Sequence, residues 1–202
     1  IYEFTLEEKV EQKETKRDKN GAFIVYIAGI DTRSGLNINS LTDVNILATV
    51  NPNTHEILLT NIPRDTYVNL RGTTGLKDKL THAGVYGVDK SVGTIEDLFD
   101  IEIDNFIRIN FSGVIKAIDL IGGVTVFNDK PFYRDGVNFK YGNIHLNGKS
   151  ALIFSRERKQ LAHGDFDRGK NQQKIISAAI QKISTTPSIL ARLDNIIATM
   201  GK

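Results

Sequence analysis

The chain has no cysteine among its 202 residues. Disulfide bonds, thiolate catalysis and cysteine-ligated metal sites are therefore excluded. Long apolar runs are absent as well, since no stretch approaches the roughly 20 apolar residues that a transmembrane helix requires. No secretory signal peptide is visible either. These absences leave the cellular compartment open.

The chain also has only a small excess of charge of one sign. Lysine and arginine number 26 and aspartate and glutamate 24, which gives a formal net charge of +2 at pH 7. So small a global charge argues against general nucleic-acid binding, and any anion site has to come from a local cluster. Hydrophobic residues make up 40% and charged residues 25% of the chain, which is ordinary for a globular domain. The length suits one domain, with or without a short appendage.

The short motifs of several enzyme classes are missing. The sequence has no G-x-S-x-G, no P-loop and no G-x-G-x-x-G. Its four histidines show no metal-ligand spacing: His55, His82, His145 and His163. Hydrolase triads, nucleotide-binding folds and histidine metal sites therefore lose support.

The charge pattern divides the chain near residue 21. Residues 1–20 alternate acidic and basic side chains and contain few apolar ones, which predicts a solvated linker or a juxtamembrane helix. We therefore expect a charged segment over residues 1–21 and a folded domain over residues 22–202.

Apolar periodicity within the folded part alternates between strand and helix. A turn cluster at residues 51–54 joins two of the strands into a hairpin. A second set of segments has helical spacing, one of them with Ser112 as its N-cap. We expect strands at 23–30, 43–50, 56–62, 105–110 and 124–127, helices at 89–99, 112–121, 151–154 and 168–183, and an irregular region in the 130s and 140s. This order predicts an α/β domain with a mixed central β-sheet flanked by helices.

A basic cluster precedes the last predicted helix. It contains Arg156, Arg158, Arg168 and Lys170 within 15 residues. Arginine forks match phosphate oxygens bidentately, so the cluster indicates a site for a multiply charged anion. If residues 155–159 are extended, Arg156 and Arg158 point to the same side. A solvated loop with surface ion pairs is the alternative; nucleic acid is disfavoured because no aromatic side chains interleave the cluster.

Three more polar residues lie at predicted strand ends. Asp31 follows the first strand, Asp43 opens the second, and Arg64 follows Pro63 after the third. Two carboxylates at neighbouring strand ends can hold Mg²⁺ beside substrate phosphates. A rigid Pro-Arg-Asp corner can aim Arg64 at a phosphate, with Asp65 orienting it. As alternatives, Asp31 begins a turn, Asp43 caps a strand and Arg64 forms an ion pair within a turn. For Lys79 a binding role and a purely structural role are both possible in the same way.

The order of these motifs resembles the LytR–CpsA–Psr family of bacterial cell-wall phosphotransferases over residues 23–183. Seven motifs carry the resemblance. They are Ile-Ala-Gly-Ile-Asp31-x-Arg33, Asp43-Val-Asn-Ile-Leu, Asn61-Ile-Pro-Arg64-Asp65, Lys79-Leu-Thr-His-Ala-x-x-Tyr-Gly, Asn110-Phe-Ser-Gly-Val-Ile-x-Ala-Ile-Asp119-x-Ile-Gly-Gly-Val, Leu146-Asn-Gly-x-x-Ala-Leu, and Arg156-x-Arg158 followed by Asp165-x-Asp167-Arg168-x-x-x-Gln172-Gln173.

The resemblance implies an α/β domain that encloses an apolar tunnel for a polyprenyl chain. It also implies a Mg²⁺-dependent transferase that moves a glycopolymer, such as capsule or teichoic acid, from a polyprenyl-pyrophosphate carrier to peptidoglycan. A polyprenyl-phosphate binding module, or a pyrophosphatase without acceptor transfer, is the alternative. Because family members usually carry one N-terminal membrane helix, we expect an anchor upstream of Ile1 and a domain on the extracytoplasmic face of the cell membrane.

The family's functional positions map onto this chain residue by residue. The resemblance implies Mg²⁺ ligation by Asp31 and Asp43, either of which is also a candidate base, and a catalytic role for Arg64. The implied pyrophosphate-binding residues are Lys79, Arg156, Arg158, Arg168 and Gln172. The chain departs from the motif at three places. Many members carry glycine where this chain has Asp167 and arginine where it has Asn171, and a serine or arginine is common where Leu41-Thr42 precedes Asp43.

Overall fold

The computed structural model describes residues 21–30, 40–75 and 77–189, which form two compact units. The N-terminal unit is Ile1–Gly113 and the C-terminal unit is Val114–Lys202. Each unit has a hydrophobic core of its own, and each is described below by itself. The predicted charged segment at residues 1–20 lies outside the described residues.

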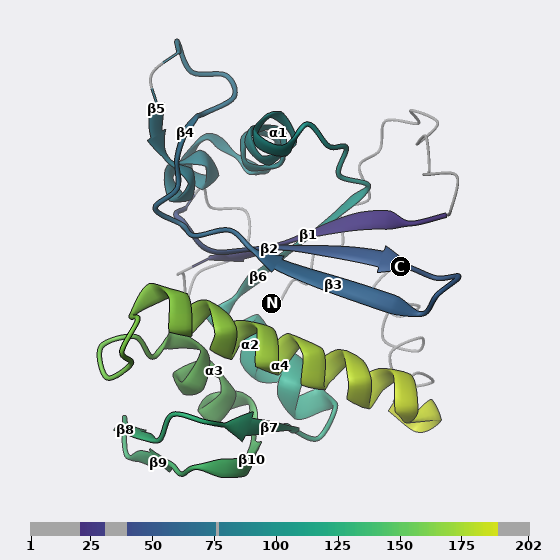
Figure 1. The fold of residues 1–202 in the computed structure, drawn as a ribbon, viewed down its shortest axis with the longest axis vertical. Helices are drawn as coiled ribbons and strands as arrows, with labels where there is room; N and C mark the ends of the chain where they lie inside the picture. The colour runs from purple at the N-terminus through teal and green to yellow at the C-terminus, as the bar shows by residue number, and fades with distance from the viewer. Residues whose placement is uncertain (1–20, 31–39, 76, 190–202) are drawn as a thin grey trace. The chain divides into compact units, whose positions relative to one another are not determined.

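A four-stranded mixed sheet forms the frame of the N-terminal unit (Figure 1). Its strands are β1 (Phe23–Ile30), β2 (Thr42–Asn51), β3 (Glu56–Asn61) and β6 (Asn105–Asn110), in the order β3-β2-β1-β6. β2 runs antiparallel to both of its neighbours, whereas β6 runs parallel to β1. The predicted hairpin and the predicted mixed sheet are therefore confirmed.

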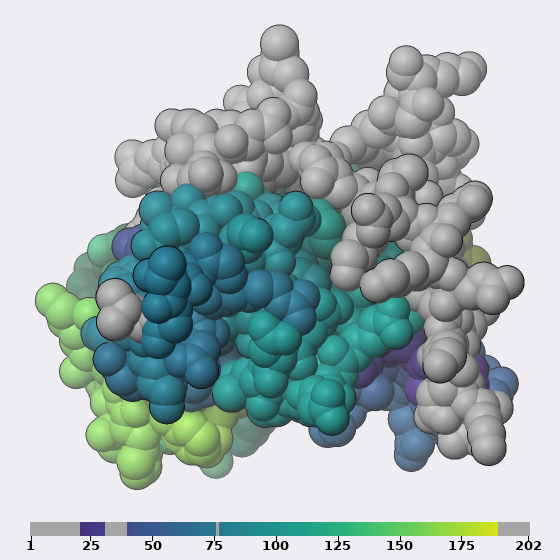
Figure 2. Space-filling view, turned by 90° about the horizontal axis from the view of Figure 1, so that it is seen from above, coloured from purple at the N-terminus to yellow at the C-terminus, as the bar shows by residue number. Residues whose placement is uncertain are grey.

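One face of this sheet is covered within the unit. Tyr26, Leu47 and Phe106 point to this face and belong to the unit's core. The same core includes side chains of η1 (Leu80–Tyr86) and α1 (Val88–Phe99). Figure 2 views the unit from this side, where the segments coloured blue to teal form the described surface. Between β3 and η1, a small hairpin pairs β4 (Tyr67–Asn69) with β5 (Lys77–Lys79).

The opposite face of the sheet is apolar too. Because alternate strand residues point to opposite sides, the neighbours of the core residues line this second face. It includes the half-buried side chains of Val25, Ile27, Val44, Ile107 and Ile109. The cores of the two units, as far as the structure describes them, contain none of these five residues.

The C-terminal unit combines helices with two small antiparallel sheets. Its elements are α2 (Phe111–Leu120), which begins just before the unit boundary, then β7 (Val124–Asn128), β8 (Phe132–Arg134), β9 (Val137–Phe139), β10 (Gly142–Leu146), α3 (Gly148–Arg156) and α4 (Asp165–Thr185). β7 pairs with β10, and β8 pairs with β9. The prediction of an irregular region in the 130s and 140s is wrong, because short strands with little apolar alternation form there.

Helix starts in this unit depend on two asparagines and a glycine. Asn110 accepts a hydrogen bond from the Gly113 N–H at 2.8 Å, so Asn110, and not the predicted Ser112, caps α2. Asn147 caps α3 by accepting from the Ser150 N–H at 2.9 Å. A Cβ atom at Gly148 would lie 2.1 Å from the Ile115 carbonyl oxygen, so only glycine allows this close approach.

A buried hydroxyl in the N-terminal sheet gives a test of this fold. Tyr26 is fully buried and donates a 2.6 Å hydrogen bond to Asn45 Oδ1, and burial raises the pKa of its hydroxyl. Tyr26→Phe leaves the buried Asn45 oxygen without this donor, so we expect the free energy of unfolding to fall by about 1–3 kcal/mol. Urea unfolding followed by circular dichroism measures the change. Tyr67→Phe, at an exposed tyrosine, should change it by less than about 0.5 kcal/mol.

Candidate functional site

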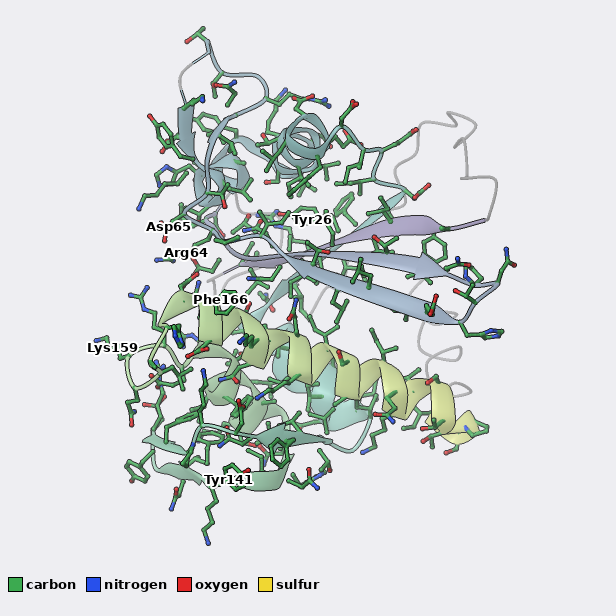
Figure 3. The ribbon with its side chains drawn as sticks, viewed as in Figure 1. Tyr26, Arg64, Asp65, Tyr141, Lys159 and Phe166 are labelled. Atoms are coloured by element: carbon green, nitrogen blue, oxygen red, sulfur yellow. The ribbon has the colours of Figure 1, made fainter. Side chains whose placement is uncertain are left out.

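The predicted site residues of the N-terminal unit meet at one edge of its sheet. β1, β3 and β6 all end at this edge and β2 begins there. Asp43 near the start of β2 and Arg64 shortly after the end of β3 therefore both lie at this edge. In α/β folds the carboxyl ends of strands are the usual place for ligands. Figure 3 shows Arg64 and Asp65 side by side at this end of the sheet.

Arg64 and Asp43 form an ion pair. Arg64 Nη1 lies 2.5 Å from Asp43 Oδ1, although the residues are 21 positions apart. Backbone hydrogen bonds fix the corner after Pro63, because the Thr66 N–H donates to the Pro63 oxygen and the Thr81 N–H to the Arg64 oxygen. The two side chains are 25% and 21% exposed, so the pair is partly desolvated and yet open to a ligand.

Asp65 connects this pair to Lys79. Lys79 Nζ lies 2.8 Å from Asp65 Oδ1, and Arg64 Nε lies 3.7 Å from Asp65 Oδ2. The side chains of Asp43, Arg64, Asp65 and Lys79 thus form a row of alternating charges. Each cation is next to a carboxylate that orients its side chain.

Asp31 lies outside the described residues, so its predicted partnership with Asp43 stays a prediction. Among residues 21–30, 40–75 and 77–189, no three acidic, histidine or cysteine side chains gather as a metal site. Asp43 is the one predicted metal ligand that the structure describes.

The C-terminal unit brings its predicted residues to the turn between α3 and α4. Arg156 is the last residue of α3, and Glu157 then has an extended backbone with φ −71° and ψ 133°. Arg156 and Arg158 are exposed, whereas Glu157 between them is 1% exposed. The extended backbone begins at Glu157 and not at residue 155, because α3 continues to Arg156, so a common direction of the two arginines stays a prediction.

Arg168 and Gln172 lie in the first two turns of α4. α4 begins at Asp165, three residues before its predicted start, and Asp165 Oδ1 lies 2.6 Å from Arg168 Nη2. Gln172 donates from Nε2 to the carbonyl oxygen of Ser155, at 3.3 Å, near the end of α3. The C-terminal unit thus gathers Arg156, Arg158, Arg168 and Gln172 around one turn, and their roles toward pyrophosphate stay predictions.

Both units therefore carry groups suited to phosphate, and comparison with known proteins shows the family. The model of the LytR_cpsA_psr family matches residues 2–202. The chain belongs to the LytR–CpsA–Psr family.

Two curated relatives show how far the similarity extends. The chain is 42% identical over 172 residues to the polyisoprenyl-teichoic acid–peptidoglycan teichoic acid transferase TagU of Oceanobacillus iheyensis, covering 82% of this chain and 52% of TagU. It is 36% identical over 190 residues to TagU of Bacillus subtilis, covering 94% of this chain and 61% of that protein. The chain thus spans between half and two thirds of the length of these relatives.

Solved structures of the family have the same fold. The crystal structure of B. subtilis TagV matches with a TM-score of 0.78 at 33% identity, over 91% of this chain and 72% of TagV. A structure of TagT bound to LIIa-WTA matches with a TM-score of 0.71 at 32% identity, over 87% of this chain and 68% of TagT. Among the described residues, no helix combines the length and the hydropathy needed to cross a bilayer.

Two of the three departures from the LytR–CpsA–Psr motif have structural roles in this member. Asn171 is buried and its amide donates to the Phe154 oxygen at 3.4 Å, which links α4 to the end of α3. Asp167 is buried and lies 2.5 Å from Lys130 Nζ, and it accepts from the His163 N–H at 3.0 Å. Both residues therefore hold the turn that carries the arginines.

Electrostatics at Asp167 follow from these contacts. Burial by itself raises the pKa of this carboxyl, but Lys130 and the His163 N–H outweigh burial and lower the pKa from 3.8 to about 2. The folded-state pKa lies below the unfolded-state value, so the carboxylate stabilises the fold fully above about pH 4. This contribution is lost as the pH falls through about 2.

Asp167→Asn tests this assignment. The shift of the pKa corresponds to about 2 kcal/mol, so we expect the variant to lose roughly that free energy of unfolding at pH 7. The difference from the wild type should shrink as the pH is lowered from 4 to 2, in urea unfolding at each pH. Asp129→Asn, which breaks an exposed ion pair with Lys174, should lose less than about 1 kcal/mol. An equal loss in both variants at pH 7 would contradict the role of burial.

Proposed function

We propose that this domain transfers a glycopolymer of the teichoic acid class from a polyprenyl-pyrophosphate carrier to a hydroxyl group of peptidoglycan. Membership of the LytR–CpsA–Psr family and the names of the TagU relatives support this activity. The observation that carries the proposal is the Arg64–Asp43 ion pair at the ligand-binding edge of the sheet. Since peptidoglycan is the acceptor, the domain acts on the extracytoplasmic face of the membrane.

In the proposed step an acceptor hydroxyl oxygen attacks the phosphorus that carries the glycan. A new P–O bond forms, and the bond from this phosphorus to the bridging oxygen of the pyrophosphate breaks. Polyprenyl monophosphate leaves with the bridging oxygen, while the hydroxyl proton passes to a base, for which Asp31 and Asp43 are the candidates. Arg64 stabilises the charge that develops on the transferred phosphate, because a guanidinium already held in position needs little reorganisation.

Mg²⁺ fits the donor chemistry of Asp43. This ion prefers oxygen ligands and is commonly held by one or two carboxylates together with substrate phosphates. Asp43 supplies such a carboxylate at the start of β2, and Asp31 is the proposed second ligand. When bound, the ion would neutralise part of the pyrophosphate charge, in addition to the arginines.

The second apolar face of the N-terminal sheet supports a lipid substrate. Val25, Ile27, Val44, Ile107 and Ile109 are half-buried there and belong to neither hydrophobic core. Strands that are buried on both faces read as nearly continuous apolar runs, so this sheet is built to be covered on both sides. We propose that a polyprenyl chain lies against the half-buried residues of this second face, with its pyrophosphate directed to the edge that holds Arg64.

Arg64→Ala tests the catalytic assignment. We expect transfer of a lipid-linked glycan to peptidoglycan oligomers to fall by about 100-fold or more, with the circular dichroism spectrum unchanged. Arg71→Ala is the matched control, because Arg71 is also an ion-paired arginine of the N-terminal unit but pairs with Glu96 and Asp97 of α1. Full activity of Arg64→Ala would refute the role of Arg64. Release of polyprenyl phosphate without labelled peptidoglycan, in the wild type, would instead favour a pyrophosphatase.

Metal removal tests the proposed cofactor. We expect EDTA to abolish transfer and added Mg²⁺ to restore it, because an ion held by the carboxylates would neutralise part of the pyrophosphate charge. Native mass spectrometry with a polyprenyl pyrophosphate should still show lipid binding without the metal, and this binding should weaken in Arg168→Ala. Undiminished transfer in EDTA would exclude a metal requirement.

A further inference from the structure

A buried glutamate lies in the middle of the arginine-bearing turn. Glu157 Oε1 accepts hydrogen bonds from the backbone N–H groups of Arg158 and Gln160, each at 2.9 Å. Glu157 Oε2 lies 3.0 Å from Arg134 Nη1. The same Nη1 donates to the carbonyl oxygen of Arg156 at 2.8 Å. The side chains of Arg134 and Glu157 therefore fix the backbone of both Arg156 and Arg158.

The β8–β9 hairpin supports this arrangement from the other side. Arg134 is the last residue of β8, and the carbonyl oxygen of its neighbour Tyr133 accepts a 2.7 Å hydrogen bond from Gln160 Nε2. The rings of Phe132 and Phe139 of the hairpin stack on each other. Their centroids lie 5.7 and 5.6 Å, respectively, from the ring centroid of Phe154 in α3. The hairpin is thus fastened to the helix that ends in Arg156.

Burial of a carboxylate costs free energy unless the charge is paired and hydrogen-bonded. Burial by itself raises the pKa of Glu157, but the N–H of Gln160, the Arg134 guanidinium and the N–H of Arg158 outweigh it and hold the pKa below its usual range. Glu157 is therefore ionised whenever the domain works. Its buried side chain lies between those of Arg156 and Arg158, which are both exposed.

We propose that Glu157, held by Arg134 of the β8–β9 hairpin, is a positioning residue that sets the spacing of Arg156 and Arg158 for the two phosphates of the lipid carrier. This inference rests on the proposed function, since it takes the pyrophosphate to be the ligand of these arginines. Two arginines at a fixed separation distinguish a pyrophosphate from a monophosphate, whereas two mobile arginines attract both by charge alone.

The experiment compares dissociation constants for geranylgeranyl pyrophosphate and geranylgeranyl monophosphate, measured by titration calorimetry on the whole chain. Glu157→Ala should weaken pyrophosphate binding by about tenfold, as is typical when a residue that orients binding groups is lost, and should affect monophosphate binding far less. Glu157→Gln keeps an oxygen for the two N–H groups but loses the ion pair, so its selectivity should lie between those of Glu157→Ala and the wild type. Faster exchange of the Arg158 and Gln160 amide protons in Glu157→Ala would report the loosened turn directly.

Asp135→Ala is the matched control. Asp135 also lies beside Arg134, with Oδ2 3.6 Å from Nε, but its side chain is 65% exposed. Its removal should leave both dissociation constants unchanged. If Glu157→Ala does not fold, Glu157→Gln and Arg134→Gln give the same comparison, because each breaks the ion pair at the side chain alone.

The outcomes separate this inference from the function on which it rests. If Arg156→Ala and Arg158→Ala weaken pyrophosphate binding but the selectivity of the Glu157 variants equals that of the wild type, the positioning role is overturned and the proposed site remains. An equal loss for both lipids would make Glu157 merely structural and would also overturn the proposal. If neither arginine variant changes pyrophosphate binding, the pyrophosphate assignment itself fails.

Discussion

The antiparallel pairing of β2 with β3 is the constraint on which the N-terminal site depends. A hairpin returns the chain to its starting edge, so the residue that opens β2 and the corner that follows β3 become neighbours. Asp43 and Arg64 meet for this reason, across 21 positions of sequence. β6 joins the sheet parallel to β1, which puts the ends of both strands at the same edge. A shift of one residue in the hairpin register would turn Asp43 to the other face and separate the pair.

The C-terminal unit arranges charge by a different rule. Its exposed arginines are carried on a turn whose backbone is held by buried carboxylates, Glu157 and Asp167. The cations that neutralise these carboxylates, Arg134 and Lys130, come from outside the turn.

Much of this fold follows from the sequence, and the exceptions have physical causes. The strands at 23–30 and 105–110 and the hairpin between them are evident from β-branched runs and a turn cluster. The short strands in the 130s and 140s were not predicted, because three to five residues with loose alternation give too weak a periodic signal. Asn110 replaces Ser112 as the cap of α2, since both residue types cap well and only the backbone decides between them.

The candidate site divides in the same way. Sequence motifs predict Asp43, Arg64 and the arginines at positions 156, 158 and 168 as site residues, because the residue type alone determines that a side chain is a guanidinium or a carboxylate. Their supports, Arg134 and Lys130, are 23 and 37 positions from the carboxylates that they neutralise, and pairing over such distances leaves no local pattern.

The doubly apolar sheet also bears on how the protein is handled at the bench. If the second face holds a polyprenyl chain, as we propose, it will also accept the alkyl chain of a detergent by the same area-dependent attraction, which has no directional preference. Micelles used to disperse a lipid substrate would then compete with that substrate for the face as well as dissolve it. Apparent affinities will depend on detergent chain length and concentration, so values from different preparations are comparable only when both are matched.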